Sequence, residues 1–221
     1  MKRQLRHLAP VQHLHNSEVR IFAAAADTPH ILGIGGTTRA DSSTEKALRF
    51  ALNVCAQQRA TTACFGAAEL SALPHYAPES PERADIARRL TGHLRRADGV
   101  IVASPGYHGN VSGMVKNALD YAEDLREDAR VYLTGVPVGL IATGAGWQAI
   151  VTTLTSLRNT VHALRGWPTP LGAAINTSSK VFEPDGECSD ERVREQLTIV
   201  AREVMSFAIS HAHSLPEIAQ G

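Results

Sequence analysis

Short apolar segments alternate with amphipathic segments from residue 30 to about residue 210, and this alternation constrains the fold more than any other feature. Runs such as residues 30–34 and 100–103 are short, apolar and typical of buried strands. Helical spacing is clearest in the stripe formed by Ile150, Leu154, Leu157, Val161 and Leu164. Five strand–helix pairs in succession predict a parallel sheet with helices on both faces.

The expected strands cover residues 30–34, 61–65, 100–103, 138–142 and 171–175. We expect helices around residues 48–55, 115–125, 150–164 and 193–207, and another that begins near residues 80–82 with Pro81 at its first position. Five strands in a doubly wound α/β sheet favour the flavodoxin-like order 2-1-3-4-5. Ligands of such sheets bind at the carboxyl ends of the strands, so the loops after strands 1 and 3 form the candidate site.

Length and composition limit the class of protein. The 221 residues suit one domain, which we place at residues 29–213, with an N-terminal extension over 1–28 and a C-terminal tail over 214–221. Lys and Arg together number 22, as do Asp and Glu, and the resulting zero net charge argues against a nucleic-acid partner. Three cysteines without CxxC spacing and no membrane-length apolar run predict a soluble cytoplasmic protein with no membrane partner.

Metal binding is not expected. Two histidine pairs, at His13 and His15 and at His211 and His213, lie near the termini without a set of carboxylates or cysteines beside them.

The loop after the first expected strand, residues 35–45, has the composition of a phosphate site. It holds two glycines, five hydroxyl side chains and Arg39, and it leads into a helix N-terminus. It is neither a Walker A loop nor a dinucleotide fingerprint, since Thr38 stands where the third glycine of the fingerprint would be. The simpler alternative is helix capping by Ser42 or Ser43, with Glu45 completing a capping box to Ser42.

The loop after the third expected strand, residues 104–113, suits a planar ligand. Gly106 and Gly109 allow the main chain to approach a flat group, while Tyr107, His108 and Asn110 offer rings and an amide. A Ser–His hydrolase is disfavoured. Ser112 is not in a GxSxG elbow, and Ser104 and His108 have no third partner.

The segments GGTTRADSST and SPGYHGNVSGMVKNALDY resemble the NAD(P)H-dependent FMN reductases of the flavodoxin-like superfamily, as does ATGAGWQAIVTTLTSLRNTVHALRGWPTPLGAAI further on. The resemblance covers about residues 30–210. Many relatives carry Glu at the position of Gly106 and Pro at that of Ser112, which bears on substrate preference. The resemblance implies three sets of FMN contacts. The phosphate would contact Gly36, Thr37, Arg39, Ser42, Ser43 and Thr44. The ribityl chain and ring edge would contact Pro105, Gly106, Tyr107, His108, Gly109 and Asn110, and the pyrimidine end would contact Thr143, Gly144, Ala145 and Gly146.

The same resemblance implies hydride transfer from NADPH or NADH to FMN and on to an acceptor. The acceptor is free flavin for a partner monooxygenase, a quinone, an azo compound or a metal ion, and the assembly is a homodimer or homotetramer. No catalytic side chain is expected, because the flavin carries the chemistry. The alternatives are a non-enzymatic electron carrier, which the zero net charge disfavours, and a flavin-binding partner protein.

Several polar and aromatic residues keep two interpretations each. Lys116, Asn117 and Asp120 are either solvent or interface residues or neighbours of the flavin. Trp147 either stacks on a ligand or lies in a subunit interface, and an interface is also the interpretation for Trp167.

Overall fold

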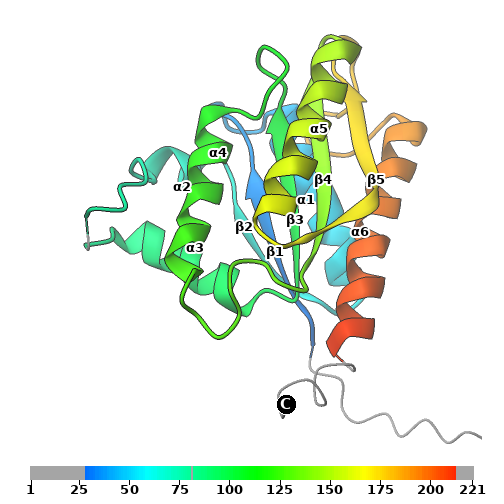
Figure 1. The fold of residues 1–221 in the computed structure, drawn as a ribbon. Coiled ribbons are helices and arrows are strands. Elements are labelled where there is room, and N and C mark those ends of the chain that lie inside the picture. Colours follow the sequence, from blue (N-terminus) through cyan, green and yellow to red (C-terminus); the bar gives the residue numbers. More distant parts are fainter. Residues whose placement is uncertain (1–27, 81, 213–221) are drawn as a thin grey trace, which may run out of the picture.

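The computed structural model describes residues 28–80 and 82–212 (Figure 1). Nearly all of the predicted N-terminal extension and the whole C-terminal tail therefore lie outside the described residues, as do the side chains of the two terminal histidine pairs. Within the described part, no helix is long and apolar enough to cross a membrane.

A single parallel sheet of five strands organises the chain. The strands are β1 (His30–Gly35), β2 (Thr61–Phe65), β3 (Gly99–Pro105), β4 (Pro137–Gly144) and β5 (Trp167–Asn176). They lie in the order β2-β1-β3-β4-β5, and every neighbouring pair is parallel. The predicted order 2-1-3-4-5 is confirmed.

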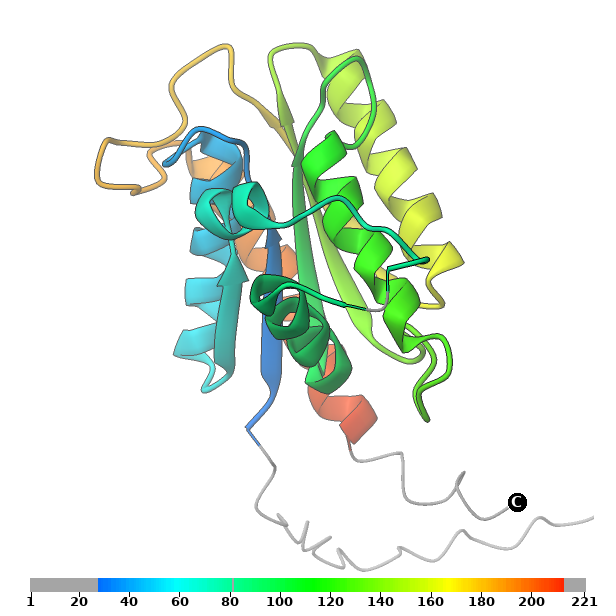
Figure 2. The same cartoon turned by 90° about the vertical axis from the view of Figure 1, so that its left-hand side faces the viewer.

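Helices cover both faces of the sheet (Figures 1 and 2). One face carries α1 (Ser43–Gln57) and α6 (Glu191–Ala212), and the other carries α3 (Asp85–Arg96), α4 (Gly113–Asp120) and α5 (Trp147–Ala163). The short helix α2 (Ala67–Ala72) follows β2, and the 3-10 helix η1 (Tyr121–Leu125) continues from α4.

Alternate residues of each central strand enter different cores, which explains why these strands read as continuous apolar runs. In β3, Val100 and Val102 pack with α3, α4 and α5, whereas Ile101 and Ala103 pack with α1 and α6. All four side chains are fully buried. Helices on both faces leave no polar position in the middle of the strand.

The prediction for α3 was wrong at its start. The helix begins at Asp85, residues 82–84 are not helical, and Pro81 lies outside the described residues. Arg83 explains why the helix begins later in the sequence than predicted. Its guanidinium donates to the carbonyl of Ala77 at 3.0 Å and to the carboxylate of Asp124 at 2.8 Å. It also lies over the ring of Tyr76, 5.0 Å from the centroid, and so holds the segment before α3 as a loop.

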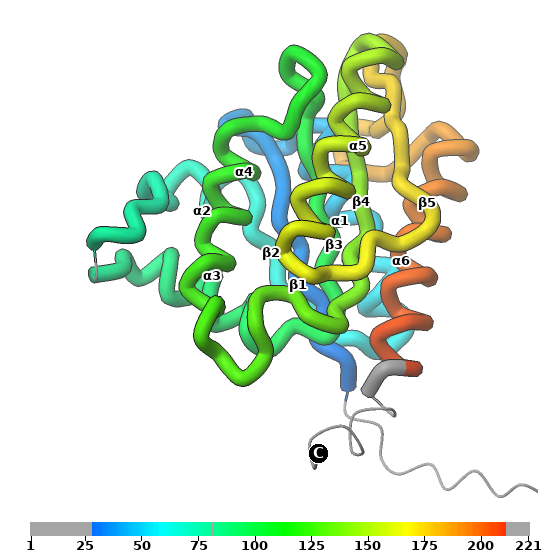
Figure 3. Tube along the Cα trace, viewed as in Figure 1, coloured from blue at the N-terminus to red at the C-terminus, as the bar shows by residue number. Residues whose placement is uncertain are grey.

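The loops after β1, β3, β4 and β5 all leave the sheet at its carboxyl end, the upper end in Figure 3. A parallel sheet brings them together because every strand ends on the same side. The loops predicted to bind a ligand are therefore neighbours in space.

Candidate functional site

The first loop of the site connects β1 to the N-terminus of α1. Gly36 has a φ of +142°, which L side chains rarely adopt, and a Cβ there would lie 3.2 Å from the Ala67 amide nitrogen. Ser42 caps α1, since its hydroxyl accepts from the Glu45 amide at 3.3 Å. The loop thus ends on the positive end of a helix dipole, which favours an anion.

Glu45 does not complete the capping box predicted for it. Its carboxylate instead accepts from the Ala67 amide at 3.2 Å and from the Arg49 guanidinium at 2.6 Å. These bonds tie the first turn of α1 to the start of α2 and satisfy a buried carboxylate. The bond to Glu45 also raises the pKa of Arg49 above its ordinary value. The i,i+4 spacing of Glu45 and Arg49 is a local signal for their ion pair, but no local pattern indicates the bond from the Ala67 amide, 22 residues away.

Arg39 lies at the exposed rim of the same loop. Its backbone is held by Thr37, whose hydroxyl lies 3.1 Å from both the amide nitrogen and the carbonyl oxygen of Arg39. Within the described part of the chain, no carboxylate forms an ion pair with the Arg39 guanidinium. This positive charge is therefore available to an anion bound at the helix N-terminus.

The second loop forms a tight turn beyond β3. The Asn110 amide donates to the Tyr107 carbonyl at 3.1 Å, and both central residues have positive φ, +53° at His108 and +78° at Gly109. Positive φ at both central positions is the pattern of a type I′ turn. The Tyr107 ring, 58 % exposed, projects from this turn at the end of the sheet.

Gly106 has a packing role besides the ligand contact that the sequence predicts. A Cβ at Gly106 would lie 2.9 Å from the Thr153 hydroxyl and 3.1 Å from the Ala149 carbonyl. Both groups belong to α5, so the element that closely approaches Gly106 is a helix of the same chain. Any side chain at this position would require the Thr153 hydroxyl or the backbone at Ala149 to shift.

Thr143 joins the three predicted ligand loops. Its carbonyl accepts from the Gly106 amide at 2.8 Å, and its hydroxyl lies 2.6 Å from the hydroxyl of Thr44. Both threonines are almost completely buried. The loop after β4 is thereby fixed to the first turn of α1 and to the loop after β3.

The third loop, residues 144–146, leads directly into α5. The Gly144 carbonyl accepts from the Thr177 amide at 2.8 Å, which ties this loop to the end of β5. Trp147, the first residue of α5, is 59 % exposed. Trp167 is similarly exposed at the start of β5, at the opposite end of the sheet, with its ring centroid 5.8 Å from that of Phe207.

The serines of the second loop are structural. Ser104 is fully buried, accepts from the Ser112 amide at 3.0 Å and donates to the Pro105 carbonyl at 2.9 Å. Ser112 caps α4 by accepting from the Val115 amide at 3.4 Å. No Ser104–His108 pair forms, so this loop holds no activated serine.

Asn117 holds a neighbouring loop. Its side chain accepts from the Tyr76 amide at 2.8 Å and donates to the Pro74 carbonyl at 2.8 Å, which fixes the segment between α2 and α3. Lys116 and Asp120 form an ion pair with each other, and both are partly solvent-exposed. For Asn117 the structure shows a role that neither interpretation named, which is to hold the segment between α2 and α3.

The three joined loops suit a flat ligand with a terminal phosphate, because they combine a capped helix N-terminus, an exposed arginine and a preformed turn bearing an aromatic ring. Consistent with this, the profile described as NADPH-dependent FMN reductase matches residues 29–180. The chain belongs to the NADPH-dependent FMN reductase family. It is an NAD(P)H-dependent oxidoreductase that uses FMN.

Several relatives of this reductase are similar in sequence or structure. An NAD(P)H-dependent FMN reductase of Pseudomonas aeruginosa is 25 % identical over 173 residues, which is 77 % of this chain and 90 % of that protein. An FMN-dependent NADPH-azoreductase of Staphylococcus aureus is 34 % identical over 115 residues, covering 50 % of this chain and 56 % of the azoreductase. The flavoenzyme FerB, an NAD(P)H:(acceptor) oxidoreductase from Paracoccus denitrificans, superimposes with a TM-score of 0.68 at 22 % identity, covering 83 % of this chain and 99 % of FerB.

Proposed function

We propose that FMN binds where the three loops meet. The proposed contacts are Gly36, Thr37, Arg39, Ser42, Ser43 and Thr44 around the phosphate, Pro105, Gly106, Tyr107, His108, Gly109 and Asn110 along the ribityl chain and ring edge, and Thr143, Gly144, Ala145 and Gly146 at the pyrimidine end. The junction at Thr143 supports this proposal most strongly, because one buried residue fixes all three loops in one arrangement.

In this proposal the groups of the reductase bind and orient FMN. No side chain acts as a catalytic acid or base. The first-turn amides of α1 and the Arg39 guanidinium neutralise the phosphate. The preformed turn at residues 107–110 and the backbone amides near Gly144 position the ring. Bound FMN supplies the capacity to accept a hydride and pass electrons on.

For the acceptor we propose an azo compound or a quinone. The support is the 34 % identity to an azoreductase over half of this chain, together with the exposed Tyr107 and Trp147 near the site. Aromatic side chains favour planar aromatic substrates. A flavin-dependent monooxygenase that takes reduced FMN from this reductase is the alternative partner.

A visible spectrum of the purified protein, with and without added FMN, tests the proposal. We expect a flavin band that survives gel filtration and bleaches when NADPH or NADH is added without oxygen. Steady-state rates with an azo dye, a quinone and free FMN then identify the acceptor. A flavin band that is lost on gel filtration, together with fast reduction of free FMN only, would favour the monooxygenase partner.

We also propose a homodimer or homotetramer in the cytoplasm, built on the single domain at residues 29–213. Trp147 and Val151, one turn apart on α5, are 59 % and 54 % exposed, which supports contact with a second subunit. The three cysteines form no disulfide, as expected in a reducing compartment. Light scattering of the wild type and of Val151→Ser tests the assembly.

A further inference from the structure

Four arginines share the outer face of α3. Arg88 and Arg89 lie one turn before Gly92, and Arg95 and Arg96 lie one turn after it. All four arginines are exposed. Residues three or four positions apart are neighbours on a helix surface, so the two arginine pairs flank the glycine at a separation of about 10 Å along the helix axis. The loops assigned to FMN leave this face unused.

Carboxylates compensate only half of the positive charge on this face. Asp85 and Asp128 each form an ion pair with one arginine, on opposite sides of the glycine. The other two arginines, Arg89 and Arg96, form no ion pair with any described residue. Burial is the first cause that lowers the pKa of His93, beneath this face, and the charges of Arg96 and Arg89 lower it further. The face therefore has an excess of two positive charges.

Gly92 is the second unusual feature of the face. Glycine is less favourable than alanine inside a helix, and a Cβ at Gly92 would meet only the Arg96 guanidinium, at 3.9 Å. The φ of Gly92 is not in the left-handed region. Neither packing nor backbone geometry within the described residues requires a glycine here. Its missing side chain instead lowers the surface between the arginines, so that another main chain can come close.

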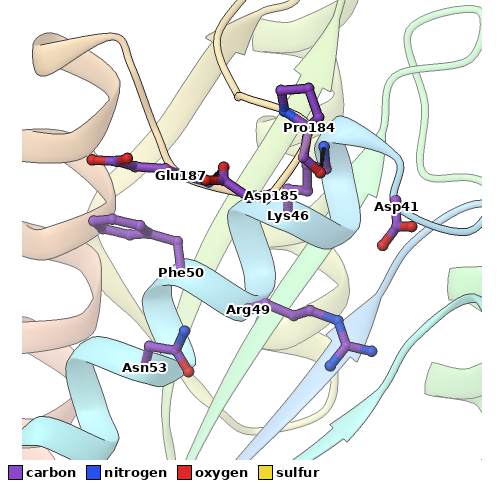
Figure 4. Close-up of a pocket in the computed structure, with 9 residues that line it drawn as sticks. Asp41, Lys46, Arg49, Phe50, Asn53, Pro184, Asp185 and Glu187 are labelled. Atoms are coloured by element: carbon purple, nitrogen blue, oxygen red, sulfur yellow. Dashed lines mark hydrogen bonds between the residues drawn. The ribbon is translucent and has the colours of Figure 1, made fainter.

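Acidic groups gather in a different part of the molecule. Three carboxylates line a cleft of about 360 Å³ between α1 and a hairpin over residues 181–189 (Figure 4). They belong to Asp41, Asp185 and Glu187. Lys46, also in the lining, is engaged, because its ammonium donates to the Glu183 carbonyl at 2.8 Å. The zero net charge of the chain is therefore compatible with a locally basic face on α3.

The composition of the face on α3 narrows the class of its partner. None of the large apolar side chains exposed in the described residues lies on α3, so the face has nothing to insert into lipid. An excess of two charges would neutralise about two phosphates, against roughly six to ten in a protein that binds DNA firmly. A second α3 would repel the first through its like charge. An acidic protein surface fits best.

We propose that α3 docks an acidic helix of a partner protein, which crosses α3 at Gly92. Carboxylates about one turn apart on that helix would reach the arginines on both sides of the glycine. Arginine suits this contact, because its planar guanidinium binds a carboxylate through two parallel hydrogen bonds. Arg89 and Arg96 contribute most, since no carboxylate neutralises them. The surface lies outside the proposed FMN site and does not depend on it.

Fluorescence anisotropy with two synthetic peptides tests the charge pattern. Both are alanine-based helices of the same length and the same number of glutamates, which lie on one face in the first peptide and around the whole helix in the second. The purified protein should bind the one-face peptide more tightly. Arg89→Gln combined with Arg96→Gln should weaken that binding about tenfold, as expected for two exposed charge pairs.

A double variant on α6 is the matched control for net charge. Arg192→Gln combined with Arg202→Gln removes the same charge at exposed positions outside α3. At about 0.1 M salt the Debye length is about 10 Å, so distant charges are screened. The affinity for the one-face peptide should therefore stay unchanged in this control.

A second test separates docking from folding. Gly92→Gln keeps the charge of the face and introduces a better helix former, so the variant should resist urea more than the wild type. Its side chain fills the space that the peptide approaches, and binding of the one-face peptide should weaken. NADPH oxidation should be unchanged in every variant, because α3 lies outside the proposed FMN site.

Four results would overturn the proposal. One is equal binding of the two peptides, or binding of neither. Another is an equal loss of affinity in the α3 and α6 double variants, which would show an unspecific effect of charge. The third is tighter binding of an oligothymidylate of the same charge than of the one-face peptide, which would indicate a nucleic-acid surface. The fourth is dissociation of an oligomer in Arg89→Gln combined with Arg96→Gln, measured by sedimentation, since the occupant would then be a second copy of this chain.

Discussion

At the scale of single residues, Arg39 is the side chain on which phosphate binding depends most directly in the proposed site. It lies at the rim of the loop after β1, and it has no ion pair within the part of the chain that the structure describes. The fold of the described residues therefore does not depend on an ion pair of this guanidinium. Its removal should therefore affect the ligand more than stability.

Arg39→Ala should weaken FMN binding by about 1.5–3 kcal/mol, the value of a hydrogen bond to a charged group. Fluorescence titration of the flavin-free protein with FMN measures this change. Riboflavin, which lacks the phosphate, is the matched ligand control, and its affinity should be the same in both proteins. An unchanged FMN affinity would remove Arg39 from the phosphate site.

At the scale of elements, α5 sets the geometry of the loop after β3. Gly106 is compatible with the observed position of α5 because it lacks a Cβ, and the Gly109 turn lies against Thr152 of the same helix. The site loop and the helix are therefore packed as one unit. A larger side chain at their contact should therefore displace both the loop and the helix.

Gly106→Ala should lower the free energy of unfolding by about 1–3 kcal/mol, because the new methyl group would overlap groups of α5 that include a backbone carbonyl. Urea denaturation measures the change. The matched control is Gly113→Ala in the first turn of α4, where nothing lies within 4 Å of the added Cβ. That variant should be as stable as the wild type or more stable by about 0.4–1 kcal/mol. Equal effects of the two substitutions would contradict the proposed packing constraint.

At the scale of the whole molecule, a histidine pair lies far from the ligand loops and links the start of β1 to α3. The His30 and His93 rings are stacked with centroids 5.2 Å apart, and His30 Nε2 lies 3.0 Å from His93 Nδ1. Burial, then the neighbouring Arg96, lowers the pKa of His93 to about 4, and the same two causes lower the pKa of His30. The folded protein thus holds both rings neutral where an unfolded chain would protonate them.

Stability should therefore fall as the pH drops from about 6.5, the unfolded histidine value, towards 4. In that window the unfolded chain binds protons that the folded state excludes, so acid favours unfolding. Urea midpoints at several pH values should show a smaller slope for His93→Gln than for the wild type. His162→Gln, at an exposed position of α5, is the control and should keep the wild-type slope. Parallel curves for wild type and His93→Gln would refute the assignment.

The sequence by itself determined the order of the sheet, and it predicts the place of the site. Apolar runs and helical stripes are local signals, and in a parallel α/β fold they decide which segments are strands and where each strand ends. The carboxyl ends of β1 and β3 then predict which loops bind a ligand, without any knowledge of side-chain contacts. The start of α3 was missed because Arg83 acts on Asp124, 41 residues away, and no local pattern reports such a bond.

Only the tertiary structure decided how the loops are held. Thr44 and Thr143 are 99 residues apart yet share a buried hydrogen bond, and Lys46 reaches a hairpin 137 residues further along the chain. Gly106 faces a helix of its own chain, although its sequence context equally suited a ligand. Such contacts depend on the packing of whole elements, so spacing along the chain does not encode them.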